Sequence, residues 1–348
     1  MKVLCVFALL LFTLPLPAEE PSMEARLASW LKQYPDADAN KDGTLTREEA
    51  EAYRAAGQSE RKRKKAPRVK PTYADVVYGD HERNRLDVWI PEKPAADGLP
   101  YPILIFFHGG GFVSGDKSSF TPSTYLDSGI ACASVNYRLV DGKETLSPVP
   151  MEDSARALQT IRHQAPDWNI DGGRIALSGG SAGAVITLWL GYHDDLADAE
   201  SEDPVSRQST RVTCLLPING PANLMPDWIL ENIGGPKHVH GSFVKLFGEP
   251  VESPLSESMR RKVAEISPWE FVSKEDPPTL LIYTGSAEGT PLPETASTAE
   301  SIHHAAFGKA LKELLDELGV ESEFREEFDP RGAPDLVDYL KTQFGMME

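Results

Sequence analysis

The sequence has 348 residues, of which 41% are hydrophobic and 25% are charged, and its formal net charge is −18 at pH 7. This composition is typical of a globular protein with one large domain and a small one, and it argues against disorder throughout the chain. The negative charge argues against a general nucleic-acid or anionic-membrane binder, because phosphate groups would repel the protein. Small molecules, cations and neutral polymers are better matched as partners.

The N-terminus has the pattern of a secretory signal peptide. Lys2 precedes an apolar run from Val3 to Leu14, and prolines and Ala18 follow before the first acidic residues. The apolar run is shorter than the about 20 residues that a transmembrane helix needs. We therefore expect a signal peptide over residues 1–18, no transmembrane segment, and an exported protein that is periplasmic or secreted. The alternative is a buried N-terminal helix.

Residues 22–57 contain the pattern of a single EF-hand. A helix is predicted from Met23 to Tyr34, the loop DANKDGTLTREE follows from Asp38, and a second helix is predicted from Arg47 to about Arg54. Acidic or amide side chains stand at the first, third, fifth and twelfth positions of this loop, and Gly43 stands at the sixth, where the chain must turn sharply. The alternative is an acidic loop with an Asp-Gly turn.

Calcium is the cofactor that this loop predicts, because Ca²⁺ is held by six to eight hard oxygen ligands. The expected ligands are the side chains of Asp38, Asn40, Asp42 and Glu49 and the backbone carbonyl of Thr44. The calcium is not expected to be catalytic, since the loop precedes the region that carries the candidate catalytic residues. Residues 58–70, with the basic run Arg61 to Lys65, are expected to form a solvated linker.

From Tyr73 onward, predicted strands and helices alternate. Strands are expected at 73–78, 85–90, 103–107, 130–136, 174–177, 212–218, 279–283 and 322–328, and helices at 151–164, 182–192, 307–318 and 335–344. Such alternation after an early hairpin predicts an α/β fold over residues 71–348, with a mostly parallel sheet and helices on both faces. Cys132 and Cys214 fall within predicted strands and are interpreted as buried free thiols.

The segment 221–278 interrupts this alternation and is expected to form a cap insertion. Most of its aromatic residues, such as Trp228 and Trp269, are expected to pack the insertion against the body, although they could line a pocket. His238 and His240 form an H-x-H pair that could bind a metal ion from a strand. No third ligand is apparent, so both are interpreted as surface histidines.

Ser181 stands in the sequence Gly179-Gly180-Ser181-Ala182-Gly183, which fits the G-x-S-x-G motif. The motif alone could be a tight turn with a small residue. Here it joins the strand 174–177 to a helix that begins near Ala182, which is the context of a nucleophile elbow. We therefore predict that Ser181 is an attacking nucleophile.

A second glycine-rich stretch, His108-Gly109-Gly110-Gly111-Phe112, follows the apolar strand 103–107. Glycines at the end of a central strand leave backbone amides free to approach a developing oxyanion. The alternative is a flexible turn.

The stretches HGGGF, DWNIDGGRIALSGGSAGA and YGDHERNRLDVWIP resemble α/β-hydrolases of the hormone-sensitive-lipase type and the related carbohydrate-esterase-like group. The resemblance extends from about Tyr73 to the C-terminus. It implies an α/β-hydrolase fold, with Ser181 as the nucleophile and the amides of Gly110, Gly111 and Ala182 as the oxyanion hole. His108 would shape the glycine loop rather than transfer protons.

The resemblance also requires an acid and a base in the second half of the chain. Glu288, after the strand 279–283, is the best candidate for the acid, with Asp276 and Glu294 as alternatives. The family's histidine would lie between the last strand and the last helix, but no histidine follows His304, and Arg331 cannot accept a proton. His303 and His304 are the remaining candidates, and we expect them to open the helix after the Glu288 loop, where the N-terminal dipole would keep them neutral. The alternative is that both histidines only close the first turn of that helix.

The sequence thus predicts an exported serine carboxylic-ester hydrolase that acts through an acyl-enzyme on a small acyl or carbohydrate ester. Its expected partners are the ester substrate and calcium, without nucleic acid. The alternative is a catalytically impaired calcium-binding protein of the same fold, which binds a ligand or partner and lacks the usual triad histidine. A peptidase of the prolyl-oligopeptidase type is disfavoured by the HGGG loop.

Overall fold

The structure is a computed structural model of the chain, which divides into two compact units, Met1–Arg68 and Val69–Glu348. The residues described are 69–93, 98–251, 254–330 and 334–346 in the second unit, and 27, 31, 37–39, 41–47, 49, 50 and 53 in the first. The predicted signal peptide, most of the predicted basic linker and the calcium-loop residue Asn40 lie outside the described residues. Each unit is considered by itself.

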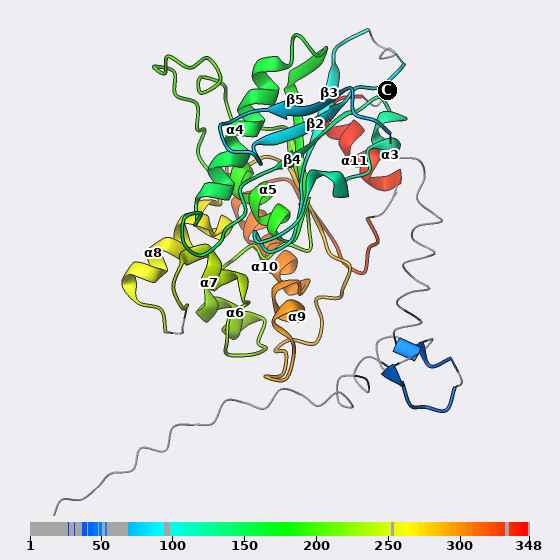
Figure 1. The fold of residues 1–348 in the computed structure, drawn as a ribbon, viewed down its shortest axis with the longest axis vertical. Helices are drawn as coiled ribbons and strands as arrows, with labels where there is room; N and C mark the ends of the chain where they lie inside the picture. The colour runs from blue at the N-terminus through cyan, green and yellow to red at the C-terminus, as the bar shows by residue number, and fades with distance from the viewer. Residues whose placement is uncertain are drawn as a thin grey trace, which may run out of the picture. The chain divides into compact units, whose positions relative to one another are not determined.

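The second unit is built on an eight-stranded sheet with the strand order β1-β2-β4-β3-β5-β6-β7-β8 (Figure 1). The strands are β1 (Tyr73–Val77), β2 (Arg85–Trp89), β3 (Tyr101–Phe107), β4 (Ala131–Asn136), β5 (Ile170–Gly180), β6 (Cys214–Ile218), β7 (Thr279–Ile282) and β8 (Ser322–Arg325). The pairs β1–β2 and β2–β4 are antiparallel, and the remaining pairs are parallel. The predicted α/β fold with a mostly parallel sheet is confirmed.

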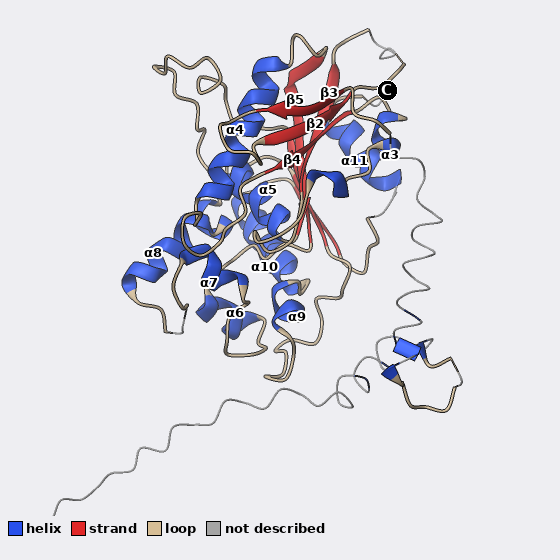
Figure 2. Ribbon diagram, viewed as in Figure 1, coloured by secondary structure: helices blue, strands red, loops and turns tan. Residues whose placement is uncertain are grey.

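Helices cover both faces of this sheet (Figure 2). They are α3 (Ser123–Leu126), α4 (Val149–Gln164), α5 (Ala182–Tyr192), α6 (Pro226–Asn232), α7 (Ser242–Phe247), α8 (Glu257–Ile266), α9 (Thr298–Ile302), α10 (Ala306–Leu318) and α11 (Pro334–Gln343), with short 3-10 turns η2 (Lys117–Ser119) and η3 (Pro268–Phe271). Buried residues of α4, α5 and α10 join one hydrophobic cluster, and those of α11 join a second cluster on the opposite face. No helix among the described residues is both long and apolar enough to cross a bilayer.

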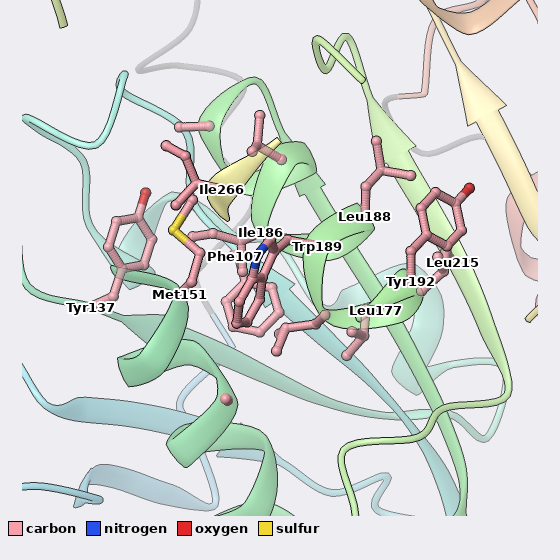
Figure 3. Close-up of a cluster of buried hydrophobic side chains, with 14 of the residues drawn as sticks. Phe107, Tyr137, Met151, Leu177, Ile186, Leu188, Trp189, Tyr192, Leu215 and Ile266 are labelled. Carbon is pink, nitrogen blue, oxygen red and sulfur yellow. The ribbon is translucent and has the colours of Figure 1, made fainter. Parts of the chain in front are cut away.

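The central strand β3 is apolar along its whole length, and both of its faces are buried. In β3, Ile103, Ile105 and Phe107 point into the larger cluster, and Leu104 points into the smaller one. Figure 3 shows Phe107 with side chains of α4 and α5, including Met151 and Trp189. Continuous burial of this kind is typical of parallel strands between two helical layers, and it holds the carboxyl ends of β3 and β5 in place.

The start of one strand and the structure of the segment between β6 and β7 go beyond what the sequence predicts. The strand β5 begins at Ile170 rather than at Arg174, because Ile170 pairs with Tyr101 and the Asp171-Gly172-Gly173 stretch stays within the strand. The segment between β6 and β7 folds into α6, α7, α8 and η3. Cys132 and Cys214 are free and buried, as predicted, and the strands β4 and β6 that carry them are separated by β3 and β5.

The first unit has a small apolar cluster of its own. Ala37, Leu45 and Ala50 are buried, and Leu27 and Leu31 pack against them. Leu45 is therefore the apolar residue of the predicted calcium loop that anchors the loop to this cluster.

Candidate active site

Ser181 lies at the turn between β5 and α5 in a backbone conformation that few residues adopt. Its φ is 54° and its ψ is −116°, and it immediately precedes the first residue of α5. The Ser181 amide donates to the carbonyl of Ile218 at 2.9 Å, which ties the turn to the neighbouring strand β6. A positive φ at a serine is strained, and this strain is characteristic of a nucleophile elbow that holds its side chain above the sheet.

The glycines around Ser181 are required by close backbone approach. A Cβ on Gly183 would overlap the carbonyl oxygen of Phe107, and a Cβ on Gly179 would overlap the backbone of Gly183. A Cβ on Gly109 would lie 3.5 Å from the Ser181 Cβ and 2.8 Å from the Gly180 carbonyl oxygen. The glycine loop after β3 and the serine turn after β5 are therefore in direct backbone contact.

The glycine loop presents backbone amides that are free of hydrogen bonds within the described part of the chain. Gly110 and Gly111 have φ of 111° and 60°, and their amides, like that of Ala182 in the first turn of α5, have no hydrogen-bond acceptor among the described residues. The Gly110 carbonyl accepts from the amides of Val113 and Ser114, both at 3.1 Å, which closes the loop on itself. Unused amides beside a nucleophile are the donors that an oxyanion hole requires.

His108 supports this loop from behind. The ring is 1% exposed, stacks on Tyr137 with centroids 4.3 Å apart, and places Nδ1 2.8 Å from the Gly109 carbonyl. Burial lowers the pKa of His108, so the imidazole is neutral near pH 7. The Tyr137 hydroxyl donates to the His108 carbonyl at 2.7 Å, which fixes the backbone at the start of the loop.

Arg83 completes this support and was not identified from the sequence. Its Nη2 donates to the Gly115 carbonyl at 3.1 Å and lies 3.3 Å from His108 Nε2, and its Nε donates to the Tyr137 carbonyl at 2.9 Å. One guanidinium thus joins the ends of β3 and β4 and the glycine loop. The arginine lies within YGDHERNR, but no local pattern distinguishes it from the other charged residues there.

The Ser181 hydroxyl contacts His303. The Ser181 Oγ lies 2.8 Å from His303 Nε2, although 122 positions separate the two residues in the chain. The His303 ring is also hydrogen-bonded to the backbone oxygen of Ala299. Since a carbonyl only accepts, Nδ1 carries the ring proton, and Nε2 is left to accept the proton of Ser181.

His303 does not open a helix, which corrects the expectation from the sequence. It caps the C-terminal end of the short helix α9, and α10 begins only at Ala306. A helix C-terminus favours the imidazolium form, so the dipole argument for a neutral ring has the wrong sign. The pKa of His303 is nevertheless lowered, chiefly by burial and further by the nearby charge of His240. The ring is neutral near pH 7 and can accept a proton.

The capping box of α9 is the signal that could have separated α9 from α10. Ser297 Oγ accepts from the Glu300 amide at 3.1 Å, and the Glu300 carboxylate accepts from the Ser297 amide at 2.7 Å. The pattern S-x-x-E marks a helix start at Thr298. A helix that begins there would carry His303 at its end rather than at its beginning.

Glu288 and His304 are adjacent to each other but not to Ser181 or the His303 ring. The Glu288 carboxylate is exposed and makes no hydrogen bond or ion pair with the described residues. His304 is hydrogen-bonded through its ring to the backbone oxygen of Glu288, and its Nδ1 accepts from the Ala306 amide at 3.2 Å. The structure therefore does not bring the Glu288 carboxylate to His303, and it gives His304 a role in holding the loop.

The two alternative acids are engaged elsewhere. Asp276 precedes β7 and accepts from the Ser273 amide at 2.8 Å and the Ser273 hydroxyl at 2.9 Å. Burial raises the pKa of Asp276 to about 6, but the residue lies at the amino end of a parallel strand, whereas Ser181 lies at a carboxyl end. Glu294 forms an exposed ion pair with Lys237 at 2.9 Å.

The predicted calcium loop is partly described. Gly43 has a φ of 85°, and its amide donates to Asp38 Oδ2 at 2.8 Å, while the Thr44 amide donates to Asp42 Oδ1 at 2.8 Å. Asp38 is 7% exposed, and its Oδ1 has no hydrogen-bond partner among the described residues. A buried carboxylate oxygen without a donor fits a cation ligand, because such an oxygen is costly without compensation.

Glu49 forms a capping box with Thr46 at the start of the helix after the loop. Glu49 Oε2 accepts from the Thr46 amide at 3.0 Å and hydroxyl at 2.7 Å, and the Glu49 amide donates to Thr46 Oγ1 at 3.2 Å. Across the described part of the chain, no group of three histidine, cysteine, aspartate or glutamate residues is close enough to hold a metal ion. The donor types fit calcium, while gathering Glu49 with Asp38 and Asp42 requires the loop to rearrange.

Comparison with known proteins identifies a family for most of the second unit. The BD-FAE family matches residues 86–298, a range that includes Ser181 and the glycine loop and ends before His303. A protein named as a probable isoprenylcysteine alpha-carbonyl methylesterase of Arabidopsis thaliana is 27% identical over 242 residues, which cover 68% of this chain and 54% of the relative. Probable carboxylesterase 7 of the same plant is 30% identical over 221 residues, which cover 59% and 64%. The chain thus spans about half to two thirds of the length of these relatives.

Solved structures share the α/β-hydrolase fold with this chain. A truncated carbohydrate esterase from gut microbiota matches with a TM-score of 0.63 and 19% identity, over 80% of this chain and all of the other. An acetyl ester-xyloside bifunctional hydrolase from Caldicellulosiruptor lactoaceticus matches with a TM-score of 0.56 and 18% identity, over 81% and 96%. Both matches bear on the fold alone.

Proposed function

We propose, from the premise that the chain belongs to the BD-FAE family of α/β-hydrolase esterases, that it is a serine carboxylic-ester hydrolase that acts through an acyl-enzyme. The observation that carries this proposal is the 2.8 Å contact between Ser181 Oγ and His303 Nε2. A nucleophile within hydrogen-bond distance of a neutral base is the arrangement that covalent catalysis requires.

In this mechanism His303 Nε2 takes the Ser181 proton as Oγ attacks the ester carbonyl carbon. The amides of Gly110, Gly111 and Ala182 donate to the resulting oxyanion, and His303 returns the proton to the leaving alcohol. Water then attacks the acyl-enzyme after giving a proton to His303, and the acid product leaves as Ser181 recovers its proton. Each step conserves protons between the serine, the histidine and the substrate.

The backbone oxygen of Ala299 takes the place that a carboxylate has in a triad. It holds the His303 proton on Nδ1 and so selects the tautomer that can accept from Ser181. A carbonyl dipole stabilises the imidazolium less than a full negative charge does, so we expect slower turnover than in a complete triad. In a serine protease, replacing the triad aspartate by asparagine costs about 10⁴ in turnover, chiefly because the wrong tautomer forms.

A short acyl group is the substrate feature that the site favours. A pocket of about 30 Å³ is lined by residues that include Ile229, Val239, His240 and Ile302. Ile302 immediately precedes His303 in the chain, although His303 and Ser181 are not themselves lining residues. A cavity needs about 10–15 Å³ to hold one water molecule, so this pocket has room for an acetyl group but not for a long acyl chain. The alcohol part is proposed to be a small or carbohydrate alcohol, in line with the carbohydrate esterases that share the fold.

The experiment compares hydrolysis of p-nitrophenyl acetate, p-nitrophenyl octanoate and an acetylated xylo-oligosaccharide by the wild-type protein and by Ser181→Ala. We expect activity on the acetate esters, a lower kcat/KM on the octanoate, and loss of all activity in Ser181→Ala. Equal activity of the two proteins would contradict the proposal.

A catalytically impaired binding protein is the second candidate, and it is favoured because no hydrogen bond or ion pair joins a carboxylate to His303 among the residues that the structure describes. An organophosphonate probe distinguishes the two candidates, because labelling requires an activated serine hydroxyl. Wild-type protein that stays unlabelled and inactive on all three esters would favour the binding protein.

We also propose that the first unit binds one calcium ion and that the protein is exported. The side chains of Asp38, Asn40, Asp42 and Glu49 and the Thr44 carbonyl would hold the ion, and the unpartnered oxygen of buried Asp38 supports this proposal. Calcium would supply charge and rigidity to the loop, without a step in ester hydrolysis. Export rests on the signal-peptide pattern of residues 1–18 and is tested by N-terminal sequencing of the mature protein.

The calcium proposal predicts that titration detects one Ca²⁺ per chain and that Glu49→Ala weakens binding at least about tenfold, because Glu49 would supply two of the ligand oxygens. Chelation should lower the melting temperature of the first unit and leave kcat on p-nitrophenyl acetate within about twofold. Wild-type affinity in Glu49→Ala would contradict the assigned ligand set.

A further inference from the structure

His240 lies in a different environment from the one that the H-x-H pattern predicts. The H-x-H pair lies in the loop between α6 and α7 rather than on a strand, with His238 exposed and His240 half-buried. The interpretation of both as surface histidines therefore holds for His238 alone. His240 lines the small pocket to which Ser301 and Ile302, the two residues before His303, also contribute.

The hydrogen bonds of His240 determine which ring nitrogen carries the proton. Nδ1 accepts from the Ser242 amide at 3.3 Å and lies 2.8 Å from the Ser242 hydroxyl. A nitrogen that accepts from a backbone amide has no proton, so the proton of the neutral ring is on Nε2. Burial lowers the pKa of His240, which keeps the ring neutral near pH 7.

Nε2 of His240 is a donor without a protein partner among the described residues. This nitrogen is not one of the buried polar atoms of the described chain that lack a partner, which indicates that it keeps some accessible surface. A half-buried N–H group with accessible surface is available to a ligand.

The ring borders the oxyanion loop. A Cβ on Gly111 would lie 3.7 Å from His240 Cε1 and 3.3 Å from Ser242 Cβ, so His240 and Ser242 lie next to the backbone of Gly111 in the glycine loop. A protonated His240 would lower the pKa of His303, so the two rings lie within electrostatic range of each other. His240 therefore lies close to both the base and the oxyanion donors of the site.

We propose that His240 is a catalytic residue whose Nε2–H donates a hydrogen bond to the ester carbonyl oxygen as that oxygen becomes the oxyanion. The proposal rests on the proposed esterase function. The pairing with Ser242 holds the ring in the donating tautomer, and the loop between α6 and α7 thereby supplies one donor of the oxyanion site. No proton is transferred from His240, because the neutral imidazole donates without ionising.

The test uses three variants in the full chain, assayed on p-nitrophenyl acetate. His240→Phe keeps a ring and removes the donor, His240→Gln keeps an N–H group at a similar reach, and His163→Phe on α4 is the matched control at another half-buried histidine. We expect His240→Phe to lower kcat about 100-fold with little change in KM, because the bond forms only in the transition state. His240→Gln should recover at least about a tenth of wild-type kcat, and His163→Phe should stay within about twofold.

A second measurement separates a catalytic role from a structural one. A trifluoromethyl ketone inhibitor forms an adduct that carries the oxyanion, so His240→Phe should weaken its inhibition by the same factor by which kcat/KM falls. Equal losses in His240→Phe and His240→Gln, with unchanged inhibition by the ketone, would overturn the proposal.

The outcome for His240 can be distinguished from the outcome for the esterase function. Wild-type kcat in His240→Phe, together with complete loss in Ser181→Ala, would overturn the role of His240 and leave the proposed function standing. Inactive wild-type protein would overturn both.

Discussion

The proposed catalytic centre has two parts, and the fold positions them in different ways. Ser181 and the glycine loop lie at the ends of the adjacent central strands β5 and β3, where Gly179 and Gly183 allow backbone contacts that any side chain would prevent. His303 lies on a connection after β7, at the end of a five-residue helix, and a single backbone oxygen orients its ring. The position of Ser181 and the glycine loop depends on close backbone contacts. The position of His303 depends on the path of the loop that carries it.

This difference explains why one part has a sequence motif and the other does not. A strained turn and a close strand–helix crossing demand glycine at fixed spacing, so the motif follows from the fold. A general base needs only a nitrogen within hydrogen-bond distance of the serine, and several loops at the carboxyl edge of the sheet could supply one. The identity of the base can therefore change while the elbow stays the same.

The largest effect is expected from a matched pair of glycine substitutions, one in each part. Gly183→Ala would push a Cβ into the Phe107 carbonyl, whereas a Cβ on Gly285, after β7, would meet nothing within 4 Å. We expect Gly183→Ala to lower kcat/KM at least about 100-fold, because a displacement near 1 Å can cost that much, and to lower the free energy of unfolding by about 1–3 kcal/mol. Gly285→Ala should change both quantities little.

Chemical denaturation and p-nitrophenyl acetate kinetics measure the two quantities on the same samples. If Gly285→Ala lowered kcat/KM as much as Gly183→Ala, the contrast between the tightly packed serine turn and the loop after β7 would be wrong.

An intermediate effect is expected in the pH dependence of kcat/KM, which tests the role of His303. The base must be neutral to accept the serine proton, so kcat/KM should rise with pH through the pKa of His303 and then level off. Burial and the charge of His240 lower this pKa below its usual value of 6.5, so the midpoint of the acid limb should lie below pH 6.5. Below the midpoint the rate should fall about tenfold per pH unit. A midpoint above pH 6.5 would contradict a buried, neutral His303.

The smallest effect is expected from Glu288→Ala. The Glu288 carboxylate is exposed and makes no hydrogen bond or ion pair within the described chain, while its backbone oxygen bonds the His304 ring. Removal of the side chain should therefore leave kcat within about threefold of the wild-type value. Loss of a triad carboxylate in subtilisin costs about 3 × 10⁴, so a fall of that size, with an unchanged melting temperature, would show that Glu288 acts in catalysis.

Much of the fold could be predicted from the sequence, because the apolar strands and amphipathic helices alternate regularly. The strand limits of β3 and β4 and the helix limits of α4 and α5 agree with the expected ranges within a few residues. The start of β5 is not predicted, because Asp171-Gly172-Gly173 has the composition of a turn. In the structure this stretch is an irregularity within the strand, between Ile170, which pairs with Tyr101, and Ile175, which pairs with Ile103.

The site was only partly predictable for physical reasons. The elbow and the glycine loop have local motifs, but the contacts of Arg83 and His240 join segments far apart in the chain. The position of His303 in the chain makes it a candidate base, yet its orientation depends on α9, for which His303 is the C-cap. Pairings of this kind follow from tertiary structure and leave no local pattern.

The measurement that tests the central claim most directly is the rate at which a fluorophosphonate labels Ser181 in wild-type protein, His303→Gln and His304→Gln. The probe reacts with the activated hydroxyl and reports the base without a substrate-binding step. Our account predicts that His303→Gln slows labelling by at least about 10³, and that His304→Gln, whose ring bonds the Glu288 loop, stays within about threefold of the wild-type rate. Unchanged labelling of His303→Gln, or a loss confined to His304→Gln, would contradict it.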